Sequence, residues 1–271
     1  MNRILNVVAL ASLSVAALLA LPAVGCSRGA HTSVTLAGST AFQPFAEKLA
    51  EHYMTTRPGV QVLVQGGGSA VGIQAALSGA ADIGMADLIE LPEEARTLTA
   101  TTVARDGIAI VVHPSNPVKD LTRSQAHDIF AGRIANWKDL GGPDAEIRVI
   151  SREEGSGTRH SFDTLVLGAD SLAPGALFQN SNGTIREAVA SDPNAVGYVS
   201  IGLISDGVRP EVYDGVEPTN ENVKKGAYPL SRPILFLTRG KPAGPALDFI
   251  DYVLSPEAQA TLEQEGLITA R

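Results

Sequence analysis

The sequence predicts an α/β fold of two lobes with a ligand bound in the cleft between them. Apolar runs typical of strands alternate along the chain with amphipathic helical patterns, and this order predicts helices layered on a sheet. Three loops rich in glycine and hydroxyl residues begin at Ala37, Gly66 and Ser151, and each precedes a helical pattern. Because loops of one kind lie in both halves of the chain, we expect the two lobes to share one ligand site.

The strongest of these loops runs from Ser151 to Arg159, with the sequence SREEGSGTR. Its small residues precede the apolar positions of a helix, where a Ser or Thr cap is usual. The first N–H groups of a helix have no partner inside the helix, and glycine leaves them accessible, so such an end suits an anion. Arg152 and Arg159 add positive charge in a geometry that suits an oxyanion.

The same pattern occurs twice upstream. Residues 37–40 (AGST) precede a helical pattern that starts near Phe42 and continues to about Thr56. Residues 66–69 (GGGS) precede another helical pattern, which Gly79 is expected to end. We therefore hypothesise that three helix ends converge on one small tetrahedral anion.

Asp87 follows a short buried strand expected at residues 81–87. Ligands of open α/β sheets bind beyond the carboxyl ends of strands, which is where Asp87 is expected. Taken alone, Asp87 is also explained as the cap of the segment that follows it, and residues 156–158 as a structural helix cap. Arg159 has alternative partners in Glu153, Glu154 and Asp163. The flanking arginines and the two related loops favour anion binding.

The remaining elements follow from the same patterns. Further strands are expected at 34–36, 60–65, 103–113, 147–150, 195–199 and 233–238, and further helices at 122–130, after Ser181, at 245–254 and at 256–266. Prolines after the strand at 103–113 predict the first crossing between the lobes. Lobe I is expected to span 34–112 and 232–271, and lobe II 113–231. The hinge candidates are 113–117 and 230–233.

Composition narrows the class of protein. The chain has 271 residues, 44% of them hydrophobic, which is ample for a core. Its net charge is -8 and it has no basic run, so a nucleic-acid-binding surface is not expected. An acidic protein that binds an anion must do so through local groups.

Residues 1–25 have the pattern of a secretory leader, in which Arg3 supplies the positive charge ahead of an apolar run. The segment 21–26 resembles a bacterial lipoprotein lipobox, although Ala23 stands where Leu is usual. The resemblance implies lipidation of Cys26, which also explains the single cysteine of an exported chain. Plain secretion and an uncleaved membrane anchor are the alternatives. Residues 26–33 are expected to form a short tether.

Taken together, these motifs resemble the phosphate-binding protein of the bacterial phosphate ABC transporter, and the similarity extends over most of residues 34–266. The resemblance rests on residues 37–40, 66–69, 82–84 with Asp87, 129–132 with 136–137 and 141–142, 151–159, and 197–198. The resemblance implies a type II periplasmic-binding-protein-like fold with the ligand in the interlobe cleft. It also implies a lipid-anchored protein on the periplasmic or extracellular face of a bacterial membrane, expected to be monomeric, that delivers phosphate to the permease subunits of an ABC transporter.

The resemblance also implies a set of phosphate ligands. These are Ser39, Thr40, the backbone N–H of Ala41, Ser69, Asp87, Arg152, Ser156, Gly157 and Thr158. One departure is Ala86, where the family often has Ser, so one polar contact is missing here.

An aspartate in an anion site can distinguish a protonated anion from an unprotonated one. Phosphate carries an O–H at neutral pH that ionised Asp87 accepts, whereas sulfate has no proton to offer. A site built to pair with a substrate O–H rejects an analogue lacking it by about 10⁴-fold or more. Because donors come from both lobes, binding is expected to favour the closed state.

Other functions fit the sequence less well. The sequence has no Walker loop, nucleophile elbow or zinc-protease motif, so an enzyme is not expected. The five histidines lack metal-ligand spacing, and neither a metal nor a cofactor is expected. A binding protein for sulfate, molybdate or tungstate, and a phosphate-sensing surface protein, are the alternatives.

Overall fold

The computed structural model describes residues 32–270 of the chain. The predicted leader, the lipidation site Cys26 and the first part of the predicted tether lie outside the described residues. Within residues 32–270 no helix is long and apolar enough to cross a membrane.

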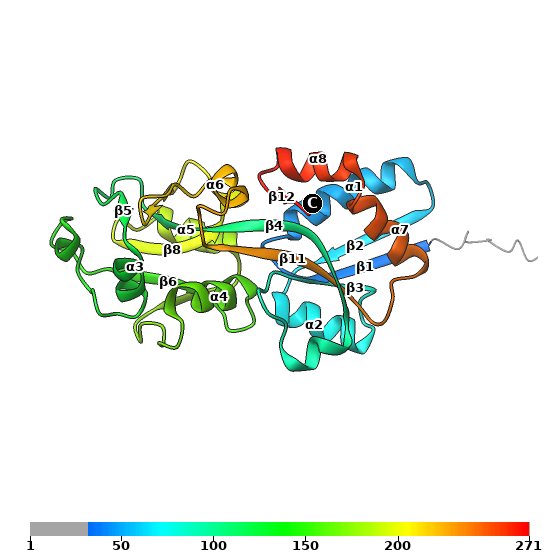
Figure 1. The fold of residues 1–271 in the computed structure, drawn as a ribbon, viewed down its shortest axis with the longest axis horizontal. Coiled ribbons are helices and arrows are strands. Elements are labelled where there is room, and N and C mark those ends of the chain that lie inside the picture. The colour runs from blue at the N-terminus through cyan, green and yellow to red at the C-terminus, as the bar shows by residue number, and fades with distance from the viewer. Residues whose placement is uncertain (1–31, 271) are drawn as a thin grey trace, which may run out of the picture. The chain divides into compact units, whose positions relative to one another are not determined.

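One mixed sheet organises the described residues (Figure 1). Its strands are β1 (Thr32–Gly38), β2 (Val60–Gln65), β3 (Ile83–Ala86), β4 (Thr99–Val112), β6 (Arg148–Arg152), β7 (Leu177–Gln179), β8 (Ala195–Ser200) and β11 (Ser231–Thr238), in the order β2-β1-β3-β11-β4-β8-β6-β7. Short β9 (Arg209–Pro210) and β12 (Ile268–Thr269) pair with β4, and β5 (Asp120–Leu121) pairs with β10 (Val212–Tyr213). Strands β2 and β3 are parallel to β1, and β7 and β8 are parallel to β6. Strand β11 is antiparallel to β3 and β4, and β4 is antiparallel to β8.

The long strand β4 joins two parts of the sheet. Residues 99–107 of β4 pair with β11, and residues 108–112 pair with β8. In Figure 1, β4 and β11 run side by side between the elements around β1 and the elements around β8. Any ligand held between these two groups of elements therefore lies close to β4 and β11.

Helices cover the sheet on each side of this crossing. They are α1 (Gln43–Thr56), α2 (Ser69–Ser78), α3 (Arg123–Phe130), α4 (Gly157–Phe162), α5 (Asn182–Ala190), α6 (Asn220–Lys224), α7 (Gly244–Val253) and α8 (Pro256–Gln264), with single turns at η1 (Glu93–Thr97), η2 (Trp137–Leu140), η3 (Asp163–Leu167) and η4 (Ile201–Leu203). Capping boxes at Thr122 and Ser181 begin α3 and α5. Left-handed Gly79 ends α2, as predicted.

The buried apolar side chains form separate clusters on the two sides. We call the region around β1, β2, β3, α1, α2, α7 and α8 the first core region, and the region around β6, β8, α3, α4 and α5 the second core region. In the first, the rings of Phe42 and Phe236 meet edge to face at 5.7 Å. In the second, Phe162 stacks on Tyr198 at 4.0 Å. Each cluster anchors the loops that leave its strands.

Most predicted elements are present, with some boundaries different. β1 begins at Thr32, two residues before the expected strand, and β4 begins at Thr99, four residues earlier than expected. Residues 99–102 (TATT) carry no apolar run, and it is their pairing with β11 that makes them a strand. The two- and three-residue strands were not predicted, because so short a segment carries no periodicity.

Glu211, between β9 and β10, is a fully buried carboxylate. Its backbone N–H donates to the carbonyl of Ile110 at 2.9 Å, and its Oε1 accepts from Arg209 at 2.9 Å. Burial raises the pKa of Glu211 from 4.5 to about 7, because the nearby Arg209 only partly offsets the loss of water.

We expect Glu211→Gln to change how stability depends on pH. Between these two pKa values the folded protein keeps a proton that the unfolded chain releases, so the wild type loses stability as pH rises through this window. The shift corresponds to about 3 kcal/mol in the free energy of unfolding between about pH 4 and pH 8. The stability of the variant relative to the wild type should therefore rise by up to that amount, measured by urea unfolding. A pH-independent difference would contradict the assignment, and Glu187→Gln, at a side chain that is 76% exposed, serves as the control.

Candidate anion-binding site

The predicted ligand residues lie where strands end. Because β1, β2 and β3 are parallel to one another, the loops at 39–42 and 66–68 and residue Asp87 leave the same edge of the sheet. Arg152 is the last residue of β6, in the second core region, and the loop that follows it leads into α4. The sheet therefore presents donors from both core regions to one place.

Asp87 is the point at which these loops meet. The residue is 1% exposed, and its Oδ1 accepts a hydrogen bond from the Ser69 hydroxyl at 2.7 Å. Its Oδ2 accepts from the Thr158 hydroxyl at 2.9 Å, and its backbone carbonyl accepts from Ser161 at 3.0 Å. Ser69 belongs to α2 and Thr158 to α4, so one carboxylate joins the two core regions.

Arg152 makes a second bridge. Its Nη2 donates to the hydroxyl of Thr40 at 3.1 Å and to Glu153 at 2.8 Å. The residue is 1% exposed, and its Nη1 finds no hydrogen-bond partner in the described part of the chain. A buried guanidinium nitrogen without an acceptor is costly unless a ligand supplies one, and an oxyanion is the matching group.

The helix end at α4 has the predicted design. Ser156 is the N-cap, and its oxygen accepts from the N–H of Arg159 at 3.2 Å. The N–H groups of Gly157 and Thr158 occupy the first two helical positions, where no acceptor exists within the helix. Ser39 has a similar local bond, because its oxygen accepts from the N–H of Phe42 at 3.2 Å.

The loops approach one another closely. The N–H of Ala70 donates to the carbonyl of Gly155 at 3.1 Å. A Cβ placed on Gly157 would lie 2.1 Å from the Ser69 hydroxyl and 2.5 Å from Asp87 Oδ1. Only glycine therefore fits at position 157 while the loops stay in contact.

The structure brings most of the predicted ligand set together. Direct contacts join Ser69, Asp87 and Thr158, and a second contact joins Arg152 to Thr40. The side-chain bond of Ser156 stays within the cap of α4, and that of Ser39 stays within the turn that precedes α1. Ala41 is buried in the first loop.

Arg159 and His160 do not join this group. The guanidinium of Arg159 donates to Asp163 at 3.3 Å and to the carbonyl of Arg152 at 3.1 Å, and it lies over the ring of Phe178. The alternative pairing with Asp163 is thus the one that the structure contains. His160 is exposed.

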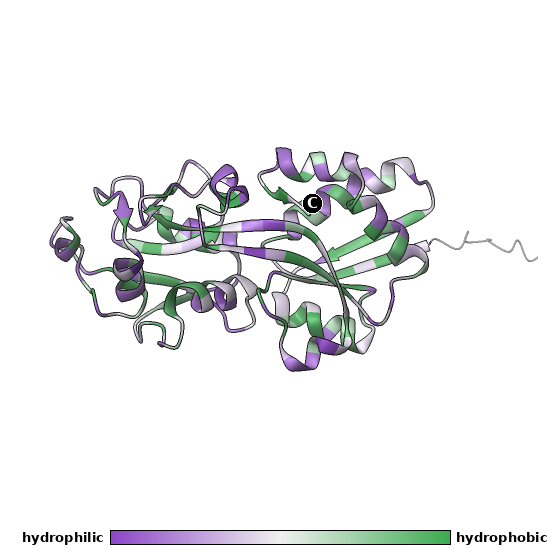
Figure 2. Cartoon of the chain, viewed as in Figure 1, coloured by the Kyte–Doolittle hydropathy of each residue, from purple (hydrophilic) through white to green (hydrophobic). Residues whose placement is uncertain are grey.

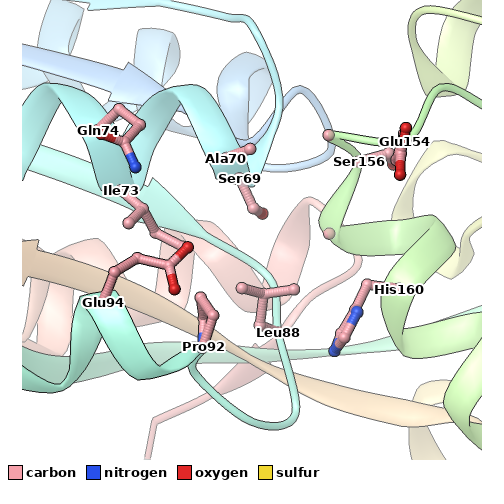
Figure 3. A pocket seen from close by; sticks show the side chains of 12 residues that line it. Ser69, Ala70, Ile73, Gln74, Leu88, Pro92, Glu94, Glu154, Ser156 and His160 are labelled. Atoms are coloured by element: carbon pink, nitrogen blue, oxygen red, sulfur yellow. The ribbon is translucent and has the colours of Figure 1, made fainter.

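A cavity of about 150 Å³ adjoins the site. Figure 3 shows Ser69, Ile73 and Gln74 of α2 on one side of it and Ser156 and His160 on the other. Of the predicted ligand residues, Ser69, Ser156 and Gly157 line it, whereas Asp87 and Arg152 do not. It contains no trio of metal-ligating side chains, and neither does any other part of residues 32–270.

Sequence reasoning missed two charged residues at the site. Arg232 of β11 places its Nη2 3.1 Å from Asp87 Oδ2 and 2.8 Å from Asp106 Oδ2 of β4. Burial raises the pKa of Asp106 to about 6, against the opposing effects of Arg232 and of a hydrogen bond from Ser200. Asp106 lies just before the apolar run at 108–112, and Arg232 lies just before the apolar run at 234–237. A charge beside a buried run requires a partner, and this is the signal that the sequence offers.

Comparison with known proteins decides the family. A profile of the PBP superfamily domain matches residues 27–257. The phosphate-binding protein PstS of Bacillus subtilis (strain 168) is 35% identical over 237 residues, covering 86% of this chain and 79% of that protein. The chain belongs to the PstS family of phosphate-binding proteins. Membership of this family of transport binding proteins confirms the resemblance found in the motifs and the expectation of a non-enzyme.

Solved structures agree with this assignment. A Clostridium perfringens protein, assigned as a phosphate ABC transporter substrate-binding protein and crystallised with bound phosphate, is 40% identical with a TM-score of 0.84. The alignment covers 89% of this chain and all of that one. An ABC-type phosphate transport receptor from Vibrio cholerae is 38% identical with a TM-score of 0.74, over 88% of this chain and all of that one. The predicted periplasmic-binding-protein-like α/β fold is confirmed.

Proposed function

We propose that this chain binds inorganic phosphate outside the cytoplasm and delivers it to the permease of an ABC transporter. The observation that carries the proposal is a buried carboxylate, Asp87, set among the donors of an anion site. The unpartnered Nη1 of Arg152 and the first N–H groups of α4 offer donors for the oxygens of the anion.

Asp87 selects for a protonated anion. Each carboxylate oxygen has two acceptor positions, and among the described residues Oδ1 accepts one hydrogen bond, from Ser69. A second position on Oδ1 remains for the O–H of phosphate. Sulfate would place bare negative charge against this buried carboxylate, which is strongly unfavourable.

Closure of two lobes is the second part of the proposal. Lobe I would comprise residues 34–112 and 232–271 and lobe II residues 113–231, around the two core regions. The hinge segments 113–117 and 230–233 follow the end of β4 and overlap the start of β11. Because Thr40, Ser69 and Asp87 are in one lobe and residues 152–158 in the other, a bound anion would complete its coordination only when the lobes meet.

The proposed location is the periplasmic or extracellular face of a bacterial membrane, with a lipid on Cys26. A secretory leader pattern before Cys26 supports export, and the PBP superfamily match begins at residue 27, directly after it. The receptor from Vibrio cholerae supports a permease as the partner. A lipid anchor would keep the protein close to that permease.

Calorimetric titration of the full chain in detergent, purified free of phosphate, tests the proposal. At pH 7 we expect one-to-one binding of phosphate and no heat from sulfate at concentrations about 1,000-fold higher. Asp87→Asn is the matched variant, because it keeps the shape of the side chain and removes the charge that repels sulfate.

Two other results of this titration would contradict the proposal in part or in full. Equal binding of phosphate and sulfate by the wild type would support an anion site but show that Asp87 does not contact the anion. Heat from neither anion would contradict the proposed function.

A further inference from the structure

Two charged side chains are buried where the long strands cross. Asp106 of β4 and Arg232 of β11 are each 1% exposed. Figure 2 shows hydrophilic residues in the middle of β4 and near the start of β11, and more hydrophobic residues toward the C-terminal end of each strand. Neither residue belongs to the proposed ligand set, and an isolated buried charge is too costly to retain without a partner.

Arg232 connects these charges to Asp87. A single nitrogen, Nη2, lies 3.1 Å from Asp87 Oδ2 and 2.8 Å from Asp106 Oδ2. The Nε and Nη1 atoms of Arg232 find no acceptor within residues 32–270. In this part of the chain, the carboxylates of Asp87 and Asp106 are therefore the partners that balance its charge.

We propose that Arg232 is a positioning residue that keeps the Asp87 carboxylate ionised and thereby sets the preference of the site for a protonated oxyanion over an unprotonated one. The inference rests on the proposed phosphate function and names the source of its specificity. Arg232 does not need to touch the anion to have this effect.

The reason lies in the two states of a buried carboxylate. Without a nearby cation, burial favours the neutral acid. The neutral acid would donate a hydrogen bond to any oxyanion, sulfate included, and would no longer select for the O–H of phosphate. The hydroxyls of Ser69 and Thr158 do not prevent this, because a hydroxyl also accepts a hydrogen bond. A fixed guanidinium, in contrast, stabilises only the ionised form.

Asp106 holds Arg232 in this position. Its Oδ2 accepts from Arg232, and its Oδ1 accepts from the Ser200 hydroxyl at 2.8 Å. Ser200 is itself fixed at the end of β8, where its backbone N–H donates to Asn182 at 3.0 Å. The chain of contacts from Ser200 through Asp106 to Arg232 thus reaches Asp87 from the second core region.

The test compares the full chain with four variants: Asp106→Asn, Arg232→Gln, these two changes together, and Arg232→Lys. The double variant removes the two paired charges at once, so it leaves no uncompensated charge at position 106 and keeps the test usable should Arg232→Gln alone fail to fold. Each protein is checked by thermal unfolding and then titrated at pH 7 with phosphate and with sulfate. The readout is the ratio of the sulfate to the phosphate dissociation constant, because a general loss of structure weakens the binding of both anions.

We expect this ratio to fall by at least about tenfold in Arg232→Gln and in the double variant. It should stay at or above the wild-type value in Asp106→Asn, because the Asn oxygen still accepts from Arg232 while the charge of Arg232 is no longer shared with position 106. Arg232→Lys, which keeps the charge, should recover most of the ratio. An unchanged ratio in the double variant, with phosphate still bound by the wild type, would overturn the inference alone. Failure of the wild type to bind phosphate would overturn the proposed function and this inference with it.

Discussion

Arg152→Ala is expected to abolish phosphate binding without unfolding the protein. The guanidinium is buried, carries a nitrogen with no partner among the described residues, and contacts Thr40 across the two core regions. Hydrogen bonds to a charged group contribute about 1.5–3 kcal/mol each, so the loss of two corresponds to about 100-fold or more in affinity. Calorimetric titration measures this loss, and thermal unfolding measures the fold.

The fold should tolerate this change because the main partner of Arg152 is Glu153, whose side chain is 34% exposed and can be solvated. Arg148→Ala is the matched control. It removes an arginine from the other end of the same strand, where the side chain is 54% exposed and pairs with Asp192. A loss of affinity of less than about tenfold in Arg152→Ala would show that this arginine is not a ligand.

Gly157→Ala is expected to weaken phosphate binding by about 10- to 100-fold. The added methyl group would lie 2.1 Å from the Ser69 hydroxyl and 2.5 Å from Asp87 Oδ1, both of which are held by hydrogen bonds. Overpacking of this kind costs about 1–3 kcal/mol, and here it acts on the contact between the two core regions. The variant should therefore favour an open state in which the two core regions are further apart. Small-angle X-ray scattering with and without phosphate would detect this state.

Gly155→Ala separates this effect from a general effect on the loop. A Cβ on Gly155 would meet only the Ala70 methyl group, at 3.4 Å, which is an ordinary contact. Phosphate affinity should change little in this variant. If the two alanine variants bind phosphate equally well, the close approach at Gly157 is not needed for binding.

Local sequence determined most elements of the fold. The strand at Val60–Gln65 has the bounds that its alternating apolar residues predicted, and α2 ends at Gly79, as the glycine predicted. A cap residue or an apolar period acts through neighbours in the chain, so it is visible without the tertiary structure. The three loops of the anion site were visible for the same reason, since each combines a helix start with small residues.

Long-range contacts determined the rest. The extension of β4 to Thr99 depends on pairing with β11, whose residues lie more than 120 positions away. The alternatives for Arg159 stayed open in the sequence, and a contact with Asp163 decides between them in the structure.

The contacts that hold Asp87 are the clearest case. The sequence marked Asp87 as a residue at a strand end, and a family resemblance implied its role, but neither pointed to Arg232 or Asp106. Asp87 directly follows β3, Arg232 belongs to β11, and Asp106 belongs to β4. Only the pairing of these strands brings the Nη2 atom of Arg232 within 3.1 Å of both carboxylates. The sequence by itself thus determined the loops that offer donors to an anion. The tertiary structure alone decided which charges surround the carboxylate, because electrostatic interactions depend on distance in space and not on position in the chain.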